Sequence, residues 1–181
     1  MNRSYFVLFT MGLMLGLNIN ASADNLAYNL EFTGAIVAQT CDIDISSLSQ
    51  SIDLGQFSVA DFPSSGTTTK FKPFNINLKN CSRGITGAKI WFTGEPDPDN
   101  PALLAITDTG MGSGSMLASG VGVEILNEDQ ETVSINNADS VVYPLKAGRN
   151  TLSFYIRYKS TRPTVTSGNA TAVMYFDMQY E

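Results

Sequence analysis

The sequence predicts an all-β protein, a β-sandwich of immunoglobulin-like size and rhythm. From Asp42 to the C-terminus it consists of short segments rich in β-branched and aromatic residues, which Gly, Pro, Asn and Ser separate. No convincing amphipathic helix interrupts this series, and no internal repeat or domain linker divides it. Many short strands in about 150 residues are typical of one β-sandwich domain.

The N-terminus has the features of a secretory signal peptide. Arg3 gives a weakly positive start, Tyr5–Leu17 is an apolar run, and Ala21-Ser22-Ala23 supplies the small residues of a cleavage site. The alternative, a membrane anchor, is disfavoured because the run is short for a bilayer span. We therefore expect residues 1–23 to be removed. We expect no membrane insertion of the mature chain, residues 24–181.

The stretch from Asn25 to Thr40 alternates apolar and small or polar residues. A period of two predicts an extended strand with one apolar face. The pattern is long for one strand of a small domain, and no turn signal precedes Gly34. The residues on the apolar face are Leu26, Tyr28, Leu30, Phe32, Gly34 and Ile36.

The sequence contains two cysteines, Cys41 and Cys81. An even count behind a signal peptide favours a disulfide, because secretion leads to an oxidising compartment. The alternative is two buried free thiols. A disulfide would leave residues 24–40 outside its loop, so that only strand pairing could hold them.

Further strands are predicted along the rest of the chain. Ser51–Phe57 and Lys70–Leu78 alternate, and Pro73 places the start of the second at a sheet edge or bulge. Val59–Phe62 is compatible with one helical turn. The other predicted strands are Lys89–Thr93, Leu103–Ile106, Val121–Leu126, Glu131–Ile135, Tyr143–Leu145 and Thr151–Tyr158.

The last segment, Ala170–Glu181, also alternates, right to the end of the chain. Chain termini usually fray unless they are tied down, so we expect this one to be held in a sheet. One face of the predicted strand carries Ala170, Ala172, Met174, Phe176, Met178 and Tyr180.

The composition argues against an enzyme. The sequence contains no histidine, which removes the commonest general base and transition-metal ligand. We expect no catalytic residues, no cofactor and no metal. The formal charge of −6, without a basic cluster, also argues against nucleic-acid binding. A secreted hydrolase remains a weak alternative.

Two groups of residues have side chains that ligand sites use. Glu95, Asp97 and Asp99 lie in a proline-rich loop that lacks the ligand spacing of an EF-hand, so a solvated loop is a better interpretation than a calcium site. Trp91 and Phe92 fit core aromatics of a sandwich better than ligand-stacking residues.

In combination, these features resemble the structural subunits, or pilins, of chaperone–usher fimbriae of the type 1 group. The resemblance covers the whole mature chain. Its elements are the signal peptide, the alternating N-terminal arm with Gly34 seven residues before Cys41, the cysteine pair and the segment Gly122–Leu126. A glycine fourteenth from the C-terminus, Gly168, and a penultimate tyrosine, Tyr180, complete the set.

The resemblance implies an immunoglobulin-like sandwich that lacks its last strand and is completed in trans by a donor strand. Residues 24–33 would be the donor arm and residues 34–181 the pilin domain. The arm residues entering the neighbour's groove would be Leu26, Tyr28, Leu30, Phe32, Gly34 and Ile36. The groove wall and chaperone-binding edge would be Gly168, Ala170, Ala172, Met174, Phe176, Met178, Tyr180 and Glu181.

It also implies the partners. A periplasmic chaperone would cap the groove, basic residues of the chaperone would hold the carboxylate of Glu181, and an outer-membrane usher would exchange the chaperone for the arm of the next subunit. The products would be head-to-tail fimbriae on the cell surface. Residues from Gly34 to Cys41 would belong to the subunit's own first strand, with Ile36 at the junction.

We therefore expect a structural fimbrial subunit that polymerises by donor-strand exchange. The alternative within the family is a minor adaptor or tip subunit that contributes to carbohydrate or host-receptor adhesion. A lectin-bearing tip adhesin would need an additional N-terminal domain. Outside the family, the alternative is an ordinary sandwich whose arm pairs within its own sheet.

Overall fold

The computed structural model describes residues 33–34, 40–108, 116–136 and 140–181. The chain forms two units, Met1–Ile36 and Val37–Glu181, and Thr33 and Gly34 are the described residues of the first. The predicted signal peptide and most of the predicted arm lie outside the described residues. The fold below is that of the second unit.

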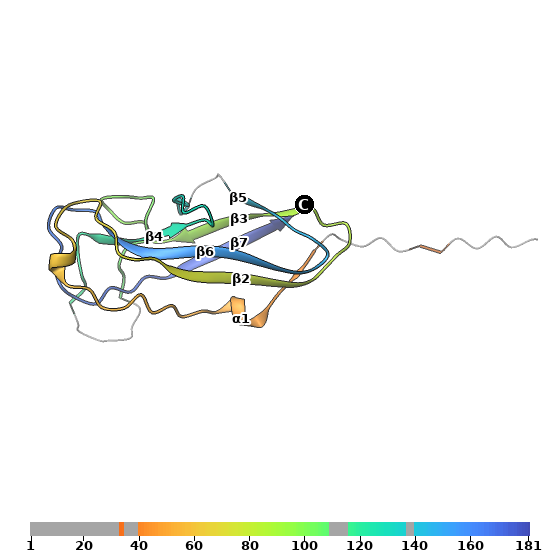
Figure 1. Cartoon of the computed structure of the whole chain (residues 1–181), viewed down its shortest axis with the longest axis horizontal. Helices are drawn as coiled ribbons and strands as arrows, with labels where there is room; N and C mark the ends of the chain where they lie inside the picture. Colours follow the sequence, from red (N-terminus) through yellow and green to blue (C-terminus); the bar gives the residue numbers. More distant parts are fainter. Residues whose placement is uncertain (1–32, 35–39, 109–115, 137–139) are drawn as a thin grey trace, which may run out of the picture. The chain divides into compact units, whose positions relative to one another are not determined.

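Two antiparallel sheets form this unit (Figure 1). The first has the strand order β1-β2-β6-β4 and the second the order β5-β3-β7. The all-β prediction is confirmed. The strands are β1 (Asp42–Ile43), β2 (Lys72–Cys81), β3 (Gly87–Gly94), β4 (Val121–Leu126), β5 (Val141–Pro144), β6 (Gly148–Ser160) and β7 (Met174–Tyr180).

Alternating side chains from both sheets meet in one hydrophobic core. Phe74 of β2 stacks on Phe154 of β6 with ring centroids 5.3 Å apart, and Phe92 of β3 meets Phe154 edge-on at 4.9 Å. Such aromatic pairs add to the stabilisation from burial alone. Phe92 is therefore a core residue, as predicted. Trp91 is half-buried, on the other face of β3.

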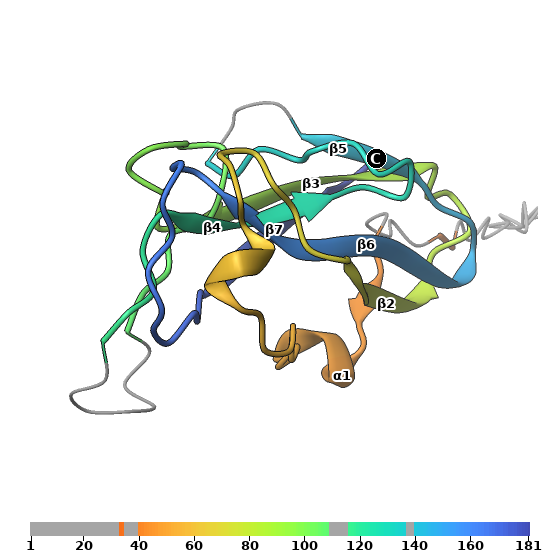
Figure 2. The ribbon, with the colours of Figure 1, turned by 60° about the vertical axis from the view of Figure 1, so that its left-hand side comes forward.

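Short helical elements flank the first sheet. The helix α1 (Ile45–Leu48) lies beside β2, where the Ser47 hydroxyl accepts a hydrogen bond from the Asn77 N–H at 2.9 Å (Figure 2). The sequence analysis missed this one-turn helix, which Asp44 caps. The helical turn predicted at Val59–Phe62 is confirmed as the 3-10 helix η1 (Val59–Asp61), with a Ser58 capping box.

Several predicted strands are wrong or shorter than expected. Ser51–Phe57 forms no strand, although Leu54 is buried and Ile52 packs against the core. Leu103–Ile106 and Glu131–Ile135 each contribute only isolated bridges, at Leu104 and Thr132. In Ser51–Phe57 and Glu131–Ile135 the exposure alternates without a continuous hydrogen-bonded ladder, whereas Leu103, Leu104 and Ala105 are all buried.

Candidate functional site

Strand β7 is an edge strand, and its edge is the centre of the candidate site. It pairs with β3 from Tyr180 opposite Ala88 to Met174 opposite Gly94. Beyond the last pair, Gly87 and Glu181 exchange two backbone hydrogen bonds, of 3.3 and 2.8 Å. Hydrogen-bonded pairs alternate along an antiparallel ladder. The even-numbered residues of β7 therefore direct their N–H and C=O groups to the edge away from β3.

The same even-numbered residues carry a half-exposed apolar face. They pack against the core but are only partly buried, whereas Leu152, Phe154 and Ile156 on the inner face of β6 are buried. The sandwich interior is thus incompletely covered along β7. This face consists of Ala170, Ala172, Met174, Phe176, Met178 and Tyr180.

The predicted face is therefore correct, but the predicted strand is too long. The hydrogen-bonded strand begins at Met174 rather than at Ala170. From Ala170 to Val173 the exposure still alternates, but this part pairs with loops: the Thr107 N–H donates to the Thr171 carbonyl at 2.8 Å.

Residues 50–57, which pack Ile52 and Leu54 against the same core, also have free backbone groups among the described residues. Within the described ranges, their one main-chain hydrogen bond runs from the Gly55 N–H to Asp53 Oδ1, at 2.9 Å. Their side chains still point inward, since Leu54 is buried and Ile52 is half-buried. Within the described ranges, residues 50–57 and the outer edge of β7 thus both have unpaired backbone groups beside partly buried apolar side chains.

Two tyrosines tie the ends of the β7 segment to the opposite sheet. Tyr180 Oη donates to the Cys41 carbonyl at 3.1 Å, and Tyr158 Oη of β6 donates to the Ala170 carbonyl at 2.5 Å. Burial of the hydroxyl raises the pKa of both tyrosines, with smaller contributions from Asp42 at Tyr180 and Asp53 at Tyr158. The segment is thus anchored at both ends, while the outer edge of its middle pairs with no other described strand.

Gly168 lies just before this segment and is exposed rather than part of the half-buried face. A Cβ added there would lie 2.4 Å from backbone atoms of Met116, Leu117 and Ala118. The next residue, Asn169, exchanges hydrogen bonds with that same stretch, to Met116 O at 2.8 Å and from Ala118 N at 2.9 Å. Gly168 therefore permits close backbone contact, which fixes where the segment begins.

The C-terminus is held within the chain. The Glu181 backbone oxygen accepts from the Thr86 N–H at 2.8 Å and from the Thr86 hydroxyl at 3.1 Å. The Glu181 side chain forms an ion pair with Lys89. The expectation that a chaperone holds the terminal carboxylate remains a prediction, and part of that carboxylate already has partners in the free chain.

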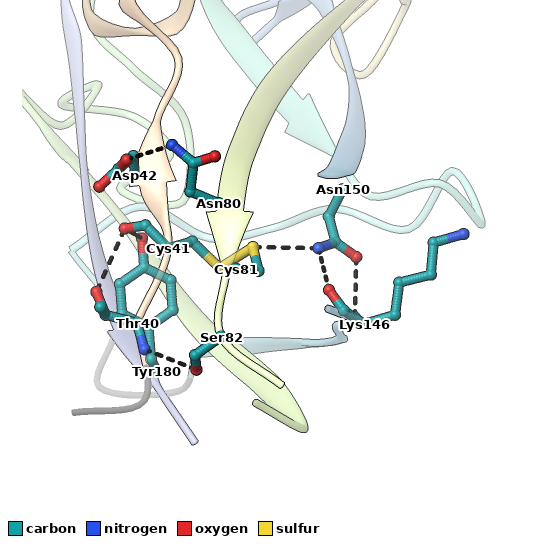
Figure 3. The surroundings of a disulfide bond; sticks show 9 residues. All are labelled: Thr40, Cys41, Asp42, Asn80, Cys81, Ser82, Lys146, Asn150 and Tyr180. Carbon is teal, nitrogen blue, oxygen red and sulfur yellow. Dashed lines mark hydrogen bonds between the residues drawn. A yellow bond between two sulfur atoms is a disulfide. The ribbon is translucent and has the colours of Figure 1, made fainter. Parts of the chain in front are cut away.

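The predicted disulfide between Cys41 and Cys81 is present (Figure 3). It joins the start of β1 to the end of β2. Thr40, where the described part of this unit begins, is the neighbour of Cys41. Thr40 and Ser82 add a backbone hydrogen bond of 3.0 Å beside it. Figure 3 also shows Tyr180 reaching the Cys41 carbonyl. The cysteine pair, Thr40 and the last residues of the C-terminal strand therefore meet at one end of the unit, called here the Cys41 end.

A buried charge cluster was missed by the sequence analysis. Glu124 of β4 is 0% exposed, and its carboxylate accepts hydrogen bonds from Arg157 at 2.6 Å, Lys159 at 2.7 Å and Thr132 at 2.8 Å. Burial raises the pKa of Glu124, but the hydrogen bonds from Lys159, Arg157 and Thr132 outweigh it and leave the pKa below its ordinary value. The one sequence signal was a glutamate inside the apolar segment Val121–Leu126.

The acidic loop has a structural role. Asp97 is buried and its Oδ1 accepts from the N–H groups of Asp99 and Asn100, both at 3.0 Å. Asp99 forms an ion pair with Arg162 at 2.6 Å. The expectation of a simply solvated loop is therefore wrong for Asp97. Among the described residues, no group of three or more His, Cys, Asp or Glu side chains is placed to hold a metal ion.

Of the predicted donor-arm residues, Gly34 is described. It is exposed, and a Cβ added to it would meet no atom within 4 Å. Leu26, Tyr28, Leu30, Phe32 and Ile36 lie outside the described residues. In the described part of the chain, no helix has the length and apolar character needed to cross a membrane.

Comparison with known proteins agrees with this geometry. A family model described as fimbrial protein matches residues 30–181. The chain is 44% identical over 154 residues to an uncharacterized fimbrial-like protein of Escherichia coli strain K12, covering 84% of each. It is 36% identical over 154 residues to the type 1 fimbrial subunit of Salmonella typhimurium, covering 84% of this chain and 82% of that protein.

Solved structures show the same fold. The type I fimbria protein of Burkholderia pseudomallei is 35% identical, with a TM-score of 0.59 over 77% of this chain and 88% of that chain. The P pilus rod subunit, at 24% identity, has a TM-score of 0.65 over 78% of this chain and 99% of that chain, and shows the immunoglobulin-like fold. The chain belongs to the fimbrial protein family.

Proposed function

We propose that this chain, a structural and non-enzymatic subunit of a surface fimbria, polymerises by donor-strand exchange. The arm of one copy, residues 24–33, would pair with the free edge of β7 in the next copy. The observation that carries the proposal is the outer backbone edge of Met174, Phe176, Met178 and Tyr180, which pairs with no other described strand and whose side chains form a half-exposed apolar face. A strand laid along this edge would satisfy the backbone and cover the face.

The arm has the composition to fill this position. Its large inward residues, Leu26, Tyr28, Leu30 and Phe32, alternate with the same period as the β7 face. Burying four such side chains contributes roughly 6–12 kcal/mol before ordering costs, as an upper bound. Gly34 follows these four residues in the sequence and would lie beyond the Met174 end of the neighbour's β7. This supports the division into an arm and a pilin domain.

Before assembly, the same edge would need protection. An unpaired edge with apolar side chains beside it is a template for aggregation. A periplasmic chaperone that lends a strand would protect it, and an outer-membrane usher would be the place where the neighbour's arm replaces that strand. These two partners follow from the resemblance and from the exposed edge.

Deletion of residues 24–32 tests the donor role. We expect the shortened chain to co-purify with its chaperone, because β7 is intact, but to be unable to enter the groove of another subunit. The matched control replaces the outward-facing Ala27 and Thr33 by serine, which leaves the apolar face of the arm unchanged. Fimbriae of normal length and subunit content from the deleted chain would refute the proposal.

A further inference from the structure

The pairing direction follows from the requirement for an open fibre, if the proposed donor-strand exchange holds. The described part of the pilin domain begins with Thr40 at the Cys41 end, where β7 also finishes at Tyr180, and β7 starts at the opposite end, at Met174. The preceding arm of the same copy would therefore join the domain at the Cys41 end. An arm antiparallel to β7 brings the Cys41 end of the donor to the Met174 end of the acceptor. Such a contact between unlike ends generates an open filament. A parallel arm would bring two Cys41 ends together.

Alternation alone leaves the register of this pairing undecided. Moving the arm by two residues keeps every apolar side chain on the inner face, so the hydrophobic pattern tolerates it. One register covers β7 in full, with Leu26 opposite Tyr180 and Phe32 opposite Met174. On the outer face of the sheet this register places Asn29 opposite Asp177.

The two neighbouring registers each carry a charge penalty. A shift that places Phe32 opposite Phe176 also places Glu31 directly opposite Asp177. A shift in the other sense turns Asp24 toward the apolar face, opposite Tyr180. Like charges on opposing residues destabilise a strand pair, and an unpaired charge against apolar surface is costly.

The surroundings of Asp177 strengthen this effect. Asp177 is exposed on β7, opposite Trp91 of β3, and makes no ion pair with any described residue. Lys89, two residues from Trp91 on β3, is already paired with Glu181. Odd-numbered residues of β7 are bonded to β3, so across the free edge they would form non-hydrogen-bonded pairs. The side chains of such pairs approach closely.

We propose that Asp177 sets the register of the entering arm by repelling Glu31 of the neighbouring copy. The inference rests on the proposed function and assigns a register-determining role to two outward-facing acidic residues. The attraction of the apolar face brings the arm in, and the acidic pair excludes the register shifted by two.

Engineered cysteines in whole fimbriae test the register. Thr33→Cys combined with Val173→Cys reports the proposed register, and Thr33→Cys combined with Tyr175→Cys reports the shifted one. Val173 and Tyr175 are 44% and 66% exposed, so oxidation can reach both. On non-reducing gels, we expect a ladder of linked subunits for the first pair and little for the second.

Charge variants then test whether repulsion between Glu31 and Asp177 sets the register. Glu31→Lys should raise the Tyr175 ladder about threefold or more relative to the Val173 ladder, because repulsion becomes attraction. Combining it with Asp177→Lys should restore the original ratio, and Glu31→Gln should have an intermediate effect. Equal ladders that Glu31→Lys leaves unchanged would overturn the register inference while leaving donor-strand exchange intact. Fimbriae without any ladder at either position would overturn the proposed function as well.

Discussion

The Tyr180 hydroxyl donates a hydrogen bond to the Cys41 carbonyl across 139 positions of sequence. This contact joins the penultimate residue to the first disulfide cysteine, and hence the second sheet to the first. It lies at the end of the unit where the disulfide and the last residues of the C-terminal strand come together (Figure 3). The free edge of β7 is therefore supported by a polar contact at its last residue.

Replacing Tyr180 by phenylalanine should lower the free energy of unfolding by about 1 kcal/mol, since it removes this hydrogen bond and leaves the Cys41 carbonyl without that donor. Urea unfolding of the purified chain measures it. Tyr143→Phe is the control, because the buried Tyr143 hydroxyl has no hydrogen-bond partner in the described structure, and its loss should be neutral or stabilising. A Tyr180 variant as stable as the Tyr143 variant would contradict the role of the contact.

Because Glu124 is buried and ionised, we expect the free energy of unfolding to fall in acid. Its folded pKa lies below the ordinary value of 4.5, so the ionised form is favoured by folding. The stabilisation is present above the unfolded pKa and is lost as pH falls through the lower folded value. Glu124→Gln should cost about 3–5 kcal/mol at pH 7, because Arg157 and Lys159 lose a buried partner. The variant should also show a shallower decline of stability below pH 4.5 than the parent.

The measurement is a series of urea titrations between pH 7 and pH 2. Glu131→Gln serves as the control, since Glu131 is an exposed carboxylate next to the same cluster. A Glu124 variant that keeps the parent's acid dependence would show that other carboxylates cause it.

The alternation of the C-terminal segment could be read from the sequence because side-chain direction has a period of two in any extended chain. The same reasoning overpredicted Ser51–Phe57 for a physical reason. Alternation reports where Ile52 and Leu54 point, whereas a strand also needs a partner for its backbone. In the described part of this subunit, the backbone of residues 51–57 has no partner strand.

Other features depend on contacts far apart in sequence. Glu124 is one acid in an apolar segment of the sequence, but its burial depends on strand β6 beside β4 and on Thr132, which bonds to it from the next segment. The four-residue helix α1 has no periodicity to detect, and only the Asp44 cap marks its start. The Tyr180–Cys41 contact requires the sheets to be packed before the two residues meet.

Gly168→Ala should destabilise the unit by about 3 kcal/mol, because the new methyl group would meet backbone atoms of residues 116–118 at 2.4 Å, and backbone cannot rotate away as a side chain can. The strain should first break the hydrogen bonds of Asn169 to Met116 and Ala118, which hold the start of the half-exposed segment. Amide exchange at Ala118, together with urea unfolding, measures both effects. Gly34→Ala is the matched control, since its Cβ meets nothing within 4 Å and should leave the unfolding free energy unchanged. If the two alanine variants unfold at the same urea concentration, the close backbone contact at Gly168 is not what fixes the start of this segment.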